Sequence, residues 1–192
     1  MRLFVAADLG EAARAALDVE QQRIREALGP STSLKWVKPE QAHLTLVFLG
    51  NVDDTKAPAI IEAMGEDIQG APFEMALEGI GVFPSRGAPR VLWIGIGAGA
   101  AKLAALQRAV AARVAALGIA VEERAFHPHL TLARWKASRP ADREPALKAA
   151  ARPGAIARTR VERTTLYQSR LSSSGPAYTP LSRGNLKVRS TE

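Results

Sequence analysis

Apolar and polar positions alternate along the chain in two rhythms, which predict strands and helices in turn. Alternation with a period of two is typical of a strand, and apolar residues three and four positions apart are typical of an amphipathic helix. Gly29 and Pro30 end the first predicted helix, and residues 39–41 form a turn. In the first half, these patterns predict strands over residues 2–8, 34–37, 43–48 and 72–82 and helices over 11–28 and 54–68.

The second half shows the same order of elements. It has predicted strands over residues 91–96, 126–135 and 158–168 and predicted helices over 103–117 and 142–151. Matched elements lie about 86 to 88 residues apart, and such a regular offset suggests a duplicated unit. We therefore predict a single α+β domain over residues 1–192, with approximate repeats 1–88 and 89–180.

A duplicated unit of this kind predicts two similar lobes, each a mainly antiparallel sheet backed by helices. If a pseudo-two-fold axis relates the lobes, equivalent residues meet near that axis, and an active site would lie in the cleft between the lobes. Residues 84–89 and 172–176 occupy matching positions in the two halves and are rich in Gly, Pro and Ser. We expect a long hairpin connection at each.

The tetrapeptide His-Leu-Thr-Leu occurs twice, beginning at His43 and at His129. In a strand, His and Thr two positions apart point to one face and the leucines point to the other. Thr45 and Thr131 thus join the histidines on one surface, although an apolar core would prefer Val at these positions. Two imidazoles and two hydroxyls supply a general acid, a general base and neutral donors for an anion, as metal-free phosphodiester cleavage requires.

Composition narrows the classes of protein that fit. The 192 residues are 47% hydrophobic and include no cysteine, which excludes disulfides, thiolate metal sites and cysteine nucleophiles. The longest apolar stretch, residues 91–101, is too short to span a bilayer, and an acidic residue interrupts the apolar N-terminus at Asp8. We therefore predict a soluble cytoplasmic protein with no membrane partner.

The net charge of +7 is unevenly distributed, because the whole basic surplus follows residue 133. From Arg134 onward there are 13 Lys and Arg against 4 Asp and Glu. Such a surface would attract a polyanion such as RNA. It is equally consistent with an Arg-rich solvated surface that binds nothing specific.

Other candidate residues favour structural roles. His127 and His129 form a His-x-His pair that could chelate a metal, but no partner at an obvious spacing completes a site, which favours a structural or supporting role for His127. Phe48 and Phe126 could stack a base, yet alternation places Phe48 on the leucine side of its strand and predicts core packing for it. The three tryptophans are too dispersed to form a nucleic-acid platform.

The two motifs and their surroundings resemble the 2H phosphoesterases, and among these the bacterial and archaeal RNA 2′,3′-cyclic phosphodiesterases, long called 2′-5′ RNA ligases. That family is defined by two His-x-Thr-x motifs about 80 to 90 residues apart. The resemblance covers nearly the whole chain. It is carried by residues 1–6, 36–40, 43–50, 128–134, 166–169 and 175–178.

This resemblance implies hydrolysis of a 2′,3′-cyclic phosphate to a 2′-phosphomonoester, without a metal or other cofactor. His43 would be the proton donor and His129 the proton acceptor, although the residues themselves do not say which histidine takes which role. Thr45, Thr131 and Arg134 would hold the phosphate. Family members also join RNA through a 2′-5′ linkage.

The implied substrates are RNA ends with a 2′,3′-cyclic phosphate, tRNA fragments among them, or cyclic nucleotides, and we expect a monomer. Two alternatives remain open at this point. One is an RNA-binding module without catalysis, which the basic last third favours. The other is a metal-dependent hydrolase using His43, His127 and His129.

Overall fold

The computed structural model describes residues 1–30, 33–121, 125–172 and 175–188. Its helices are α1 (Glu11–Leu28), α2 (Ala57–Gly65), α3 (Ala100–Ala116) and α4 (Arg143–Ala150), with short 3-10 turns η1 (Pro39–Gln41) and η2 (Pro140–Asp142). Its strands are β1 (Arg2–Asp8), β2 (Leu34–Trp36), β3 (His43–Asn51), β4 (Ile68–Gln69), β5 (Phe73–Phe83), β6 (Val91–Ile96), β7 (His129–Trp135), β8 (Ala155–Val161), β9 (Arg163–Ser172) and β10 (Gly175–Lys187).

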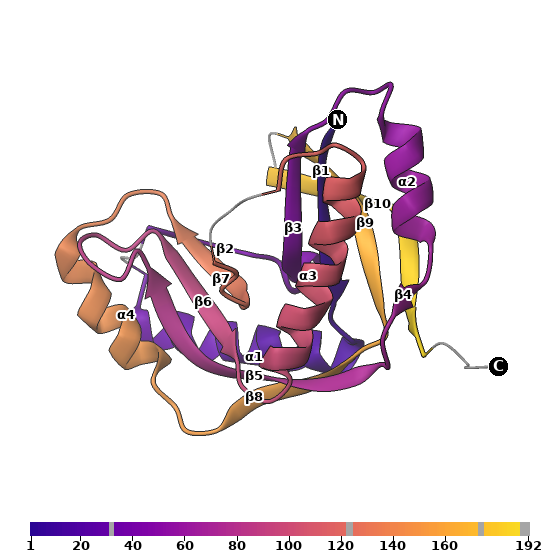
Figure 1. Cartoon of the computed structure of the whole chain (residues 1–192). Helices are drawn as coiled ribbons and strands as arrows, with labels where there is room; N and C mark the ends of the chain where they lie inside the picture. The colour runs from indigo at the N-terminus through magenta and orange to yellow at the C-terminus, as the bar shows by residue number, and fades with distance from the viewer. Residues whose placement is uncertain (31–32, 122–124, 173–174, 189–192) are drawn as a thin grey trace.

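These strands form two five-stranded sheets, in the orders β3-β1-β9-β10-β4 and β2-β7-β6-β5-β8. All pairings are antiparallel except that of β10 with the short strand β4. In Figure 1 the first sheet stands upright on the right and the second lies at the lower left. Helix α2 packs on β9 and β10, α3 on β3, α1 on β8 and α4 on β5. The predicted α+β architecture of two helix-backed sheets is confirmed.

Each sheet takes strands from both halves of the chain. Strands β5 and β2 of the first half lie in the second sheet, whereas β9 and β10 of the second half lie in the first sheet. The predicted hairpin at residues 84–89 is confirmed, because β5 and β6 pair antiparallel on either side of it. Strands β9 and β10 also form a hairpin, although residues 173–174 at its tip lie outside the described residues. Neither sheet can therefore form from one predicted repeat alone.

The single strand predicted over residues 158–168 is wrong, because two strands occupy this region. β8 ends at Val161 in the second sheet, and β9 begins at Arg163 in the first. No Gly or Pro marks the crossing at Glu162, so the alternation runs through it without a break signal. Two other boundaries also moved. The helix predicted over residues 54–68 is shorter in the structure, where α2 spans Ala57–Gly65. The strand predicted from residue 126 begins only at His129, because Pro128 before it has no N–H to donate to a neighbouring strand.

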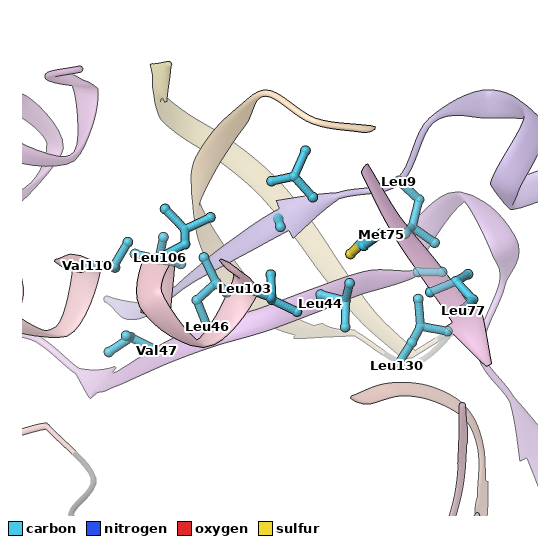
Figure 2. Packing of buried hydrophobic residues seen from close by; sticks show 14 of the residues in the cluster. Leu9, Leu44, Leu46, Val47, Met75, Leu77, Leu103, Leu106, Val110 and Leu130 are labelled. Atoms are coloured by element: carbon cyan, nitrogen blue, oxygen red, sulfur yellow. The ribbon is translucent and has the colours of Figure 1, made fainter. Parts of the chain in front are cut away.

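The leucines of the two tetrapeptides enter one continuous core. Leu44, Leu130 and Leu132 are fully buried, and Leu46 is nearly so. Figure 2 shows Leu44, Leu46 and Val47 of β3 lying beside the side chains of α3, with Leu130 of β7 on the side of Leu77. Each pair of leucines thus anchors the strand whose other face carries the histidine and threonine. Among the described helices, none is long and apolar enough to cross a membrane.

Candidate active site

Both histidines stand at the first position of a strand, and the same hydrogen bond orients each ring. The Nδ1 atom of His43 lies 2.7 Å from the carbonyl oxygen of Gln41, and Nδ1 of His129 lies 2.7 Å from that of His127. Because a carbonyl oxygen only accepts, each Nδ1 must carry the proton that it donates. This bond fixes the tautomer and leaves Nε2 as the ring atom that can exchange a proton with a ligand.

A β-bulge interrupts each motif strand at the same place. In the pairing of β1 with β3, Val5 faces Val47 but Ala6 faces Thr45, so Leu46 is the extra residue. In the pairing of β6 with β7, Leu92 faces Ala133 but Trp93 faces Thr131, so Leu132 is the extra residue. An extra residue reverses the alternation beyond it. The fifth residue after each histidine is therefore turned to the histidine's own face.

That reversal overturns the core packing predicted for Phe48. Its ring is 54% exposed, and it lies on the side of His43 and Thr45 rather than with the leucines. The same reversal puts Arg134, which is exposed, on the face of His129 and Thr131. Strict alternation would have directed both side chains into the core.

The surroundings of His43 are aromatic. Its ring centroid lies 4.8 Å from that of Phe4, 5.0 Å from that of Tyr178, which meets it edge-on, and 6.1 Å from that of Tyr167. A cavity of about 320 Å³ opens here, lined in part by Arg14, His43 and the two tyrosines. Burial lowers the pKa of His43 from its ordinary value, while the hydrogen bond to Gln41 and the charge of Asp8 act in the opposite direction.

Asp8 is the direct cross-strand partner of His43, and the sequence interpretation missed it. Its carboxylate accepts hydrogen bonds from the hydroxyl of Thr165, at 2.7 Å, and from that of Tyr167, at 2.6 Å. Burial and the bond to Asp8 together raise the pKa of Tyr167 well above its ordinary value, so the phenol stays protonated as a donor. The arrangement places a fixed negative charge and an ordered phenol ring beside the imidazole.

The surroundings of His129 are more open. Phe83 meets the His129 ring edge-on at 5.1 Å, and Trp93 lies 6.4 Å away. The cross-strand partner of His129 is Gly95, in the place that Asp8 takes opposite His43. A larger cavity, about 430 Å³, opens beside it and is lined in part by Phe83, Trp93 and His129. The sequence interpretation dismissed Trp93 as dispersed, because the pairing of β6 with β7 that brings it near His129 joins strands that α3 separates in the sequence.

The two motif strands pack against each other although they belong to different sheets. Beside the larger effect of burial, the positive charge of Arg134 on β7 contributes to lowering the pKa of His43 and opposes the rise in the pKa of Tyr178 in the first sheet. The structure therefore brings together His43, the aromatic rings around it and the arginine of the second motif. Thr45 and Thr131 are half-buried on the same faces as their histidines.

His127 takes a supporting position. Its side chain is exposed, and its backbone carbonyl is the acceptor that orients His129. Within the described part of the chain, no group of three or more His, Cys, Asp or Glu side chains is arranged to hold a metal. The arrangement thus supplies no ligand set for the alternative that combined His43, His127 and His129.

A family model described as the 2′-5′ RNA ligase superfamily matches residues 13–172. The chain belongs to this superfamily. Among its relatives, an RNA 2′,3′-cyclic phosphodiesterase of Archaeoglobus fulgidus is 34% identical over 181 residues, which cover 94% of this chain and 98% of the relative. The Thermus thermophilus protein of the same name is 38% identical over 194 residues, covering 97% of this chain and 91% of the relative.

Solved structures of superfamily members agree with this assignment. The crystal structure of a Thermus thermophilus protein superposes with a TM-score of 0.77 at 32% identity, covering 99% of this chain and 100% of that one. Escherichia coli LigT complexed with 3′-AMP superposes with a TM-score of 0.74 at 28% identity, covering 96% and 97%. The resemblance to 2H phosphoesterases and the prediction of an enzyme of this kind are confirmed.

Proposed function

We propose that the protein hydrolyses a 2′,3′-cyclic phosphate at the end of an RNA, or on a nucleotide, to a 2′-phosphomonoester. The observation that carries this proposal is the pair of histidines with identical Nδ1 hydrogen bonds, each leaving Nε2 for proton transfer. The relatives named RNA 2′,3′-cyclic phosphodiesterase, and the capture of 3′-AMP by LigT, support a nucleotide phosphate as the substrate.

In the proposed reaction, His129 Nε2 takes a proton from water while the water oxygen attacks phosphorus. The bond from phosphorus to the 3′ oxygen breaks, and His43 Nε2 gives that oxygen a proton, which leaves a 3′-hydroxyl and a 2′-phosphate. Arg134 and the hydroxyls of Thr45 and Thr131 would hold the phosphate oxygens as charge develops on them. Acid and base exchange protonation states in each turnover.

The proton-donor role of His43 needs a bound phosphate, because burial lowers the pKa of this imidazole and favours its neutral form in the free protein. The negative charge of a bound phosphodiester raises the pKa of a neighbouring imidazole and so restores the donor. A substrate whose 3′ oxygen is replaced by sulfur tests the role, since a thiolate leaves without a proton donor. This substrate should rescue His43→Ala and not His129→Ala; the reverse pattern would exchange the two roles.

The decisive experiment is turnover of a nucleoside 2′,3′-cyclic phosphate, with the product identified by phosphorus NMR. Formation of the 2′-phosphate supports the proposal. A protein that binds RNA but turns nothing over would instead be the non-catalytic binding module. We expect the activity to persist in excess EDTA, and an inactive apoprotein restored by zinc or manganese would favour the metal-dependent alternative.

The same groups would join RNA if a 5′-hydroxyl replaced water as the nucleophile. Its attack on the cyclic phosphate, with release of the 3′ oxygen, forms a 2′-5′ phosphodiester. We propose this as a reversible secondary activity, favoured at high concentrations of 5′-hydroxyl RNA. Gel analysis of tRNA half-molecules incubated with the protein checks it. A cytoplasmic, monomeric protein remains our expectation, and sedimentation of the purified chain measures the oligomeric state.

A further inference from the structure

A buried polar side chain of helix α1 reaches the second motif strand at its bulge. Gln21 is only 1% exposed, although its neighbours on the same face of α1, Leu17 and Ile24, are apolar and fully buried. A buried amide has lost its hydrogen bonds to water, so it needs partners within the protein. The proposed reaction uses no atom of Gln21, and the partners of this side chain therefore show what it does.

The Gln21 amide bonds to two backbone carbonyls in different segments. Its Nε2 donates to the carbonyl oxygen of Val37 at 2.8 Å and to that of Leu132 at 3.2 Å. The Leu132 oxygen also accepts the Val37 N–H, at 2.8 Å. Because an amide nitrogen carries two hydrogens, these two bonds use its whole donor capacity. One side chain thus joins α1, the residue that follows β2, and β7.

The bond to Leu132 is made at the bulge of the second motif strand. Leu132 is the extra residue of that bulge, which turns Arg134 to the face of His129 and Thr131. Arg134 itself pairs with Lys35 of β2, two residues before Val37. A bulge disrupts the ladder and bends the strand. The direction of the residues after it therefore depends on how the bulge is held, and Gln21 holds it to the end of β2.

The guanidinium of Arg134 depends on this direction. It binds phosphate through a rigid fork of donors, so it must approach the phosphate at a defined angle. Within the described part of the chain, Arg134 forms no ion pair with a carboxylate. No acidic side chain there fixes its aim, which leaves the backbone of β7 to set it.

We propose that Gln21 is a positioning residue for Arg134, because it fixes the bulge from which the arginine is directed to the phosphate. This inference rests on the proposed function. Gln21 is too deeply buried to touch a substrate, so it acts only through the backbone that it holds. A displacement of about 1 Å at a group that contacts the reacting atoms can lower a rate by about 10²-fold.

The test is the Gln21→Met substitution, alone and combined with Arg134→Ala. Methionine keeps the length and the apolar packing but donates no hydrogen bond. We expect kcat/KM for a nucleoside 2′,3′-cyclic phosphate to fall by about 5- to 100-fold, and no further than in Arg134→Ala. In the Arg134→Ala protein, the same substitution should cost less than about twofold, because both changes remove one interaction. A merely structural role would lower the two proteins by the same factor.

The neighbouring glutamine is the matched control. Gln22 is exposed, and its amide donates to Asp18 of the same helix at 3.4 Å. Gln22→Met should leave turnover unchanged with or without Arg134. Asp8→Asn lies in the first sheet, so its loss should multiply with that of Gln21→Met. Thermal unfolding of every variant sets an assay temperature at which all of them are folded.

Gln21→Asn is a milder second variant, because its amide is one methylene shorter and cannot reach both carbonyls. It should show a smaller loss that also disappears in Arg134→Ala. Equal losses with and without Arg134, or wild-type kcat/KM in folded Gln21→Met, would overturn the inference. Failure of both variants to fold would also overturn it, since Gln21 would then serve the fold alone. A wild-type protein inactive on the cyclic phosphate would overturn the proposed function instead.

Discussion

The two motif strands carry the same functional side chains, but the residues that surround the two histidines differ. β3 and β7 present the same histidine, threonine and bulge, and both imidazoles donate from Nδ1 to the carbonyl two residues earlier. Opposite His43 stands Asp8, a carboxylate that binds Thr165 and Tyr167. Opposite His129 stands Gly95, with an open cavity and an indole ring nearby.

This difference shows how one duplicated motif can supply two distinct roles. The elements that fix the tautomer and the ring direction are identical, so both imidazoles are prepared for proton transfer. The neighbours that set charge and access are not identical. They lie on other strands, β1 and β9 for His43 and β5 and β6 for His129, and can therefore diverge without disturbing the motif.

Removing either motif histidine, which the two strands have in common, should have the largest effect on turnover. We expect His43→Ala and His129→Ala each to lower turnover of a nucleoside 2′,3′-cyclic phosphate by about 10²- to 10⁴-fold, the usual contribution of a positioned acid or base. The double variant should be little worse than either single one, because the two groups act in one step. His127→Ala is the matched control and should remain near wild type, since the substitution keeps the backbone carbonyl that orients His129. Near-normal turnover in either single variant would remove the mechanism.

Substitution of Arg134 on β7 tests its proposed role in holding the phosphate. Arg134→Ala removes a permanent positive charge but neither titrating group, so kcat/KM should fall by about 10- to 10³-fold with little movement of the pH profile. Arg134→Lys should recover only part of the loss, because a point charge cannot reproduce the guanidinium fork. Arg108→Ala, an exposed arginine on α3, is the control for net charge. If Arg134→Ala keeps wild-type kinetics, the threonines and backbone must hold the phosphate without it.

The pH profile tests whether both imidazoles titrate. One must be charged and the other neutral, so kcat/KM should follow a bell whose limbs are macroscopic values of the pair. Burial lowers the pKa of His43, so the limb to which it contributes should lie on the acid side of about 6.5. The bell for kcat should lie at higher pH, because the bound anion raises imidazole pKa values. Initial rates measured from about pH 4 to 9 at several substrate concentrations give the pH profiles of kcat/KM and of kcat. A flat profile would contradict two titrating histidines.

Asp8→Asn should have the smallest effect and probes only the His43 side. The charge of Asp8 opposes the lowering of the His43 pKa by burial, so its loss should lower that pKa further and move the corresponding limb to more acid pH. A shift of less than about one unit changes kcat/KM above the limb by no more than about tenfold. Asp18→Asn, exposed on α1, is the control. If Asp8→Asn leaves this limb of the pH profile unchanged, Asp8 serves only as a structural hydrogen-bond partner of Tyr167.

Local patterns were sufficient for much of the fold. The strands over residues 2–8 and 91–96 and the helix over 11–28 have the predicted bounds, and the helix ends at the strong local signal of Gly29. His43, Thr45, His129 and Thr131 also followed from local sequence, since two-residue alternation holds as far as the leucine after each threonine. Their catalytic and phosphate-binding roles stay predictions.

The tertiary structure decided which way the side chains after each tetrapeptide point and which residues surround the histidines. The bulges that turn Phe48 and Arg134 toward the histidines depend on registers with β1 and β6, and the partners of His43, Asp8 and Tyr167, come from strands far apart in the sequence. Likewise, the exchange of β5 and β9 between the sheets follows from pairings that no local pattern encodes. The sequence by itself determined which residues could do chemistry, because alternation and capping are local. Which side chains surround each histidine was decided only by strand pairing, because hydrogen bonds between strands join residues that the chain keeps apart.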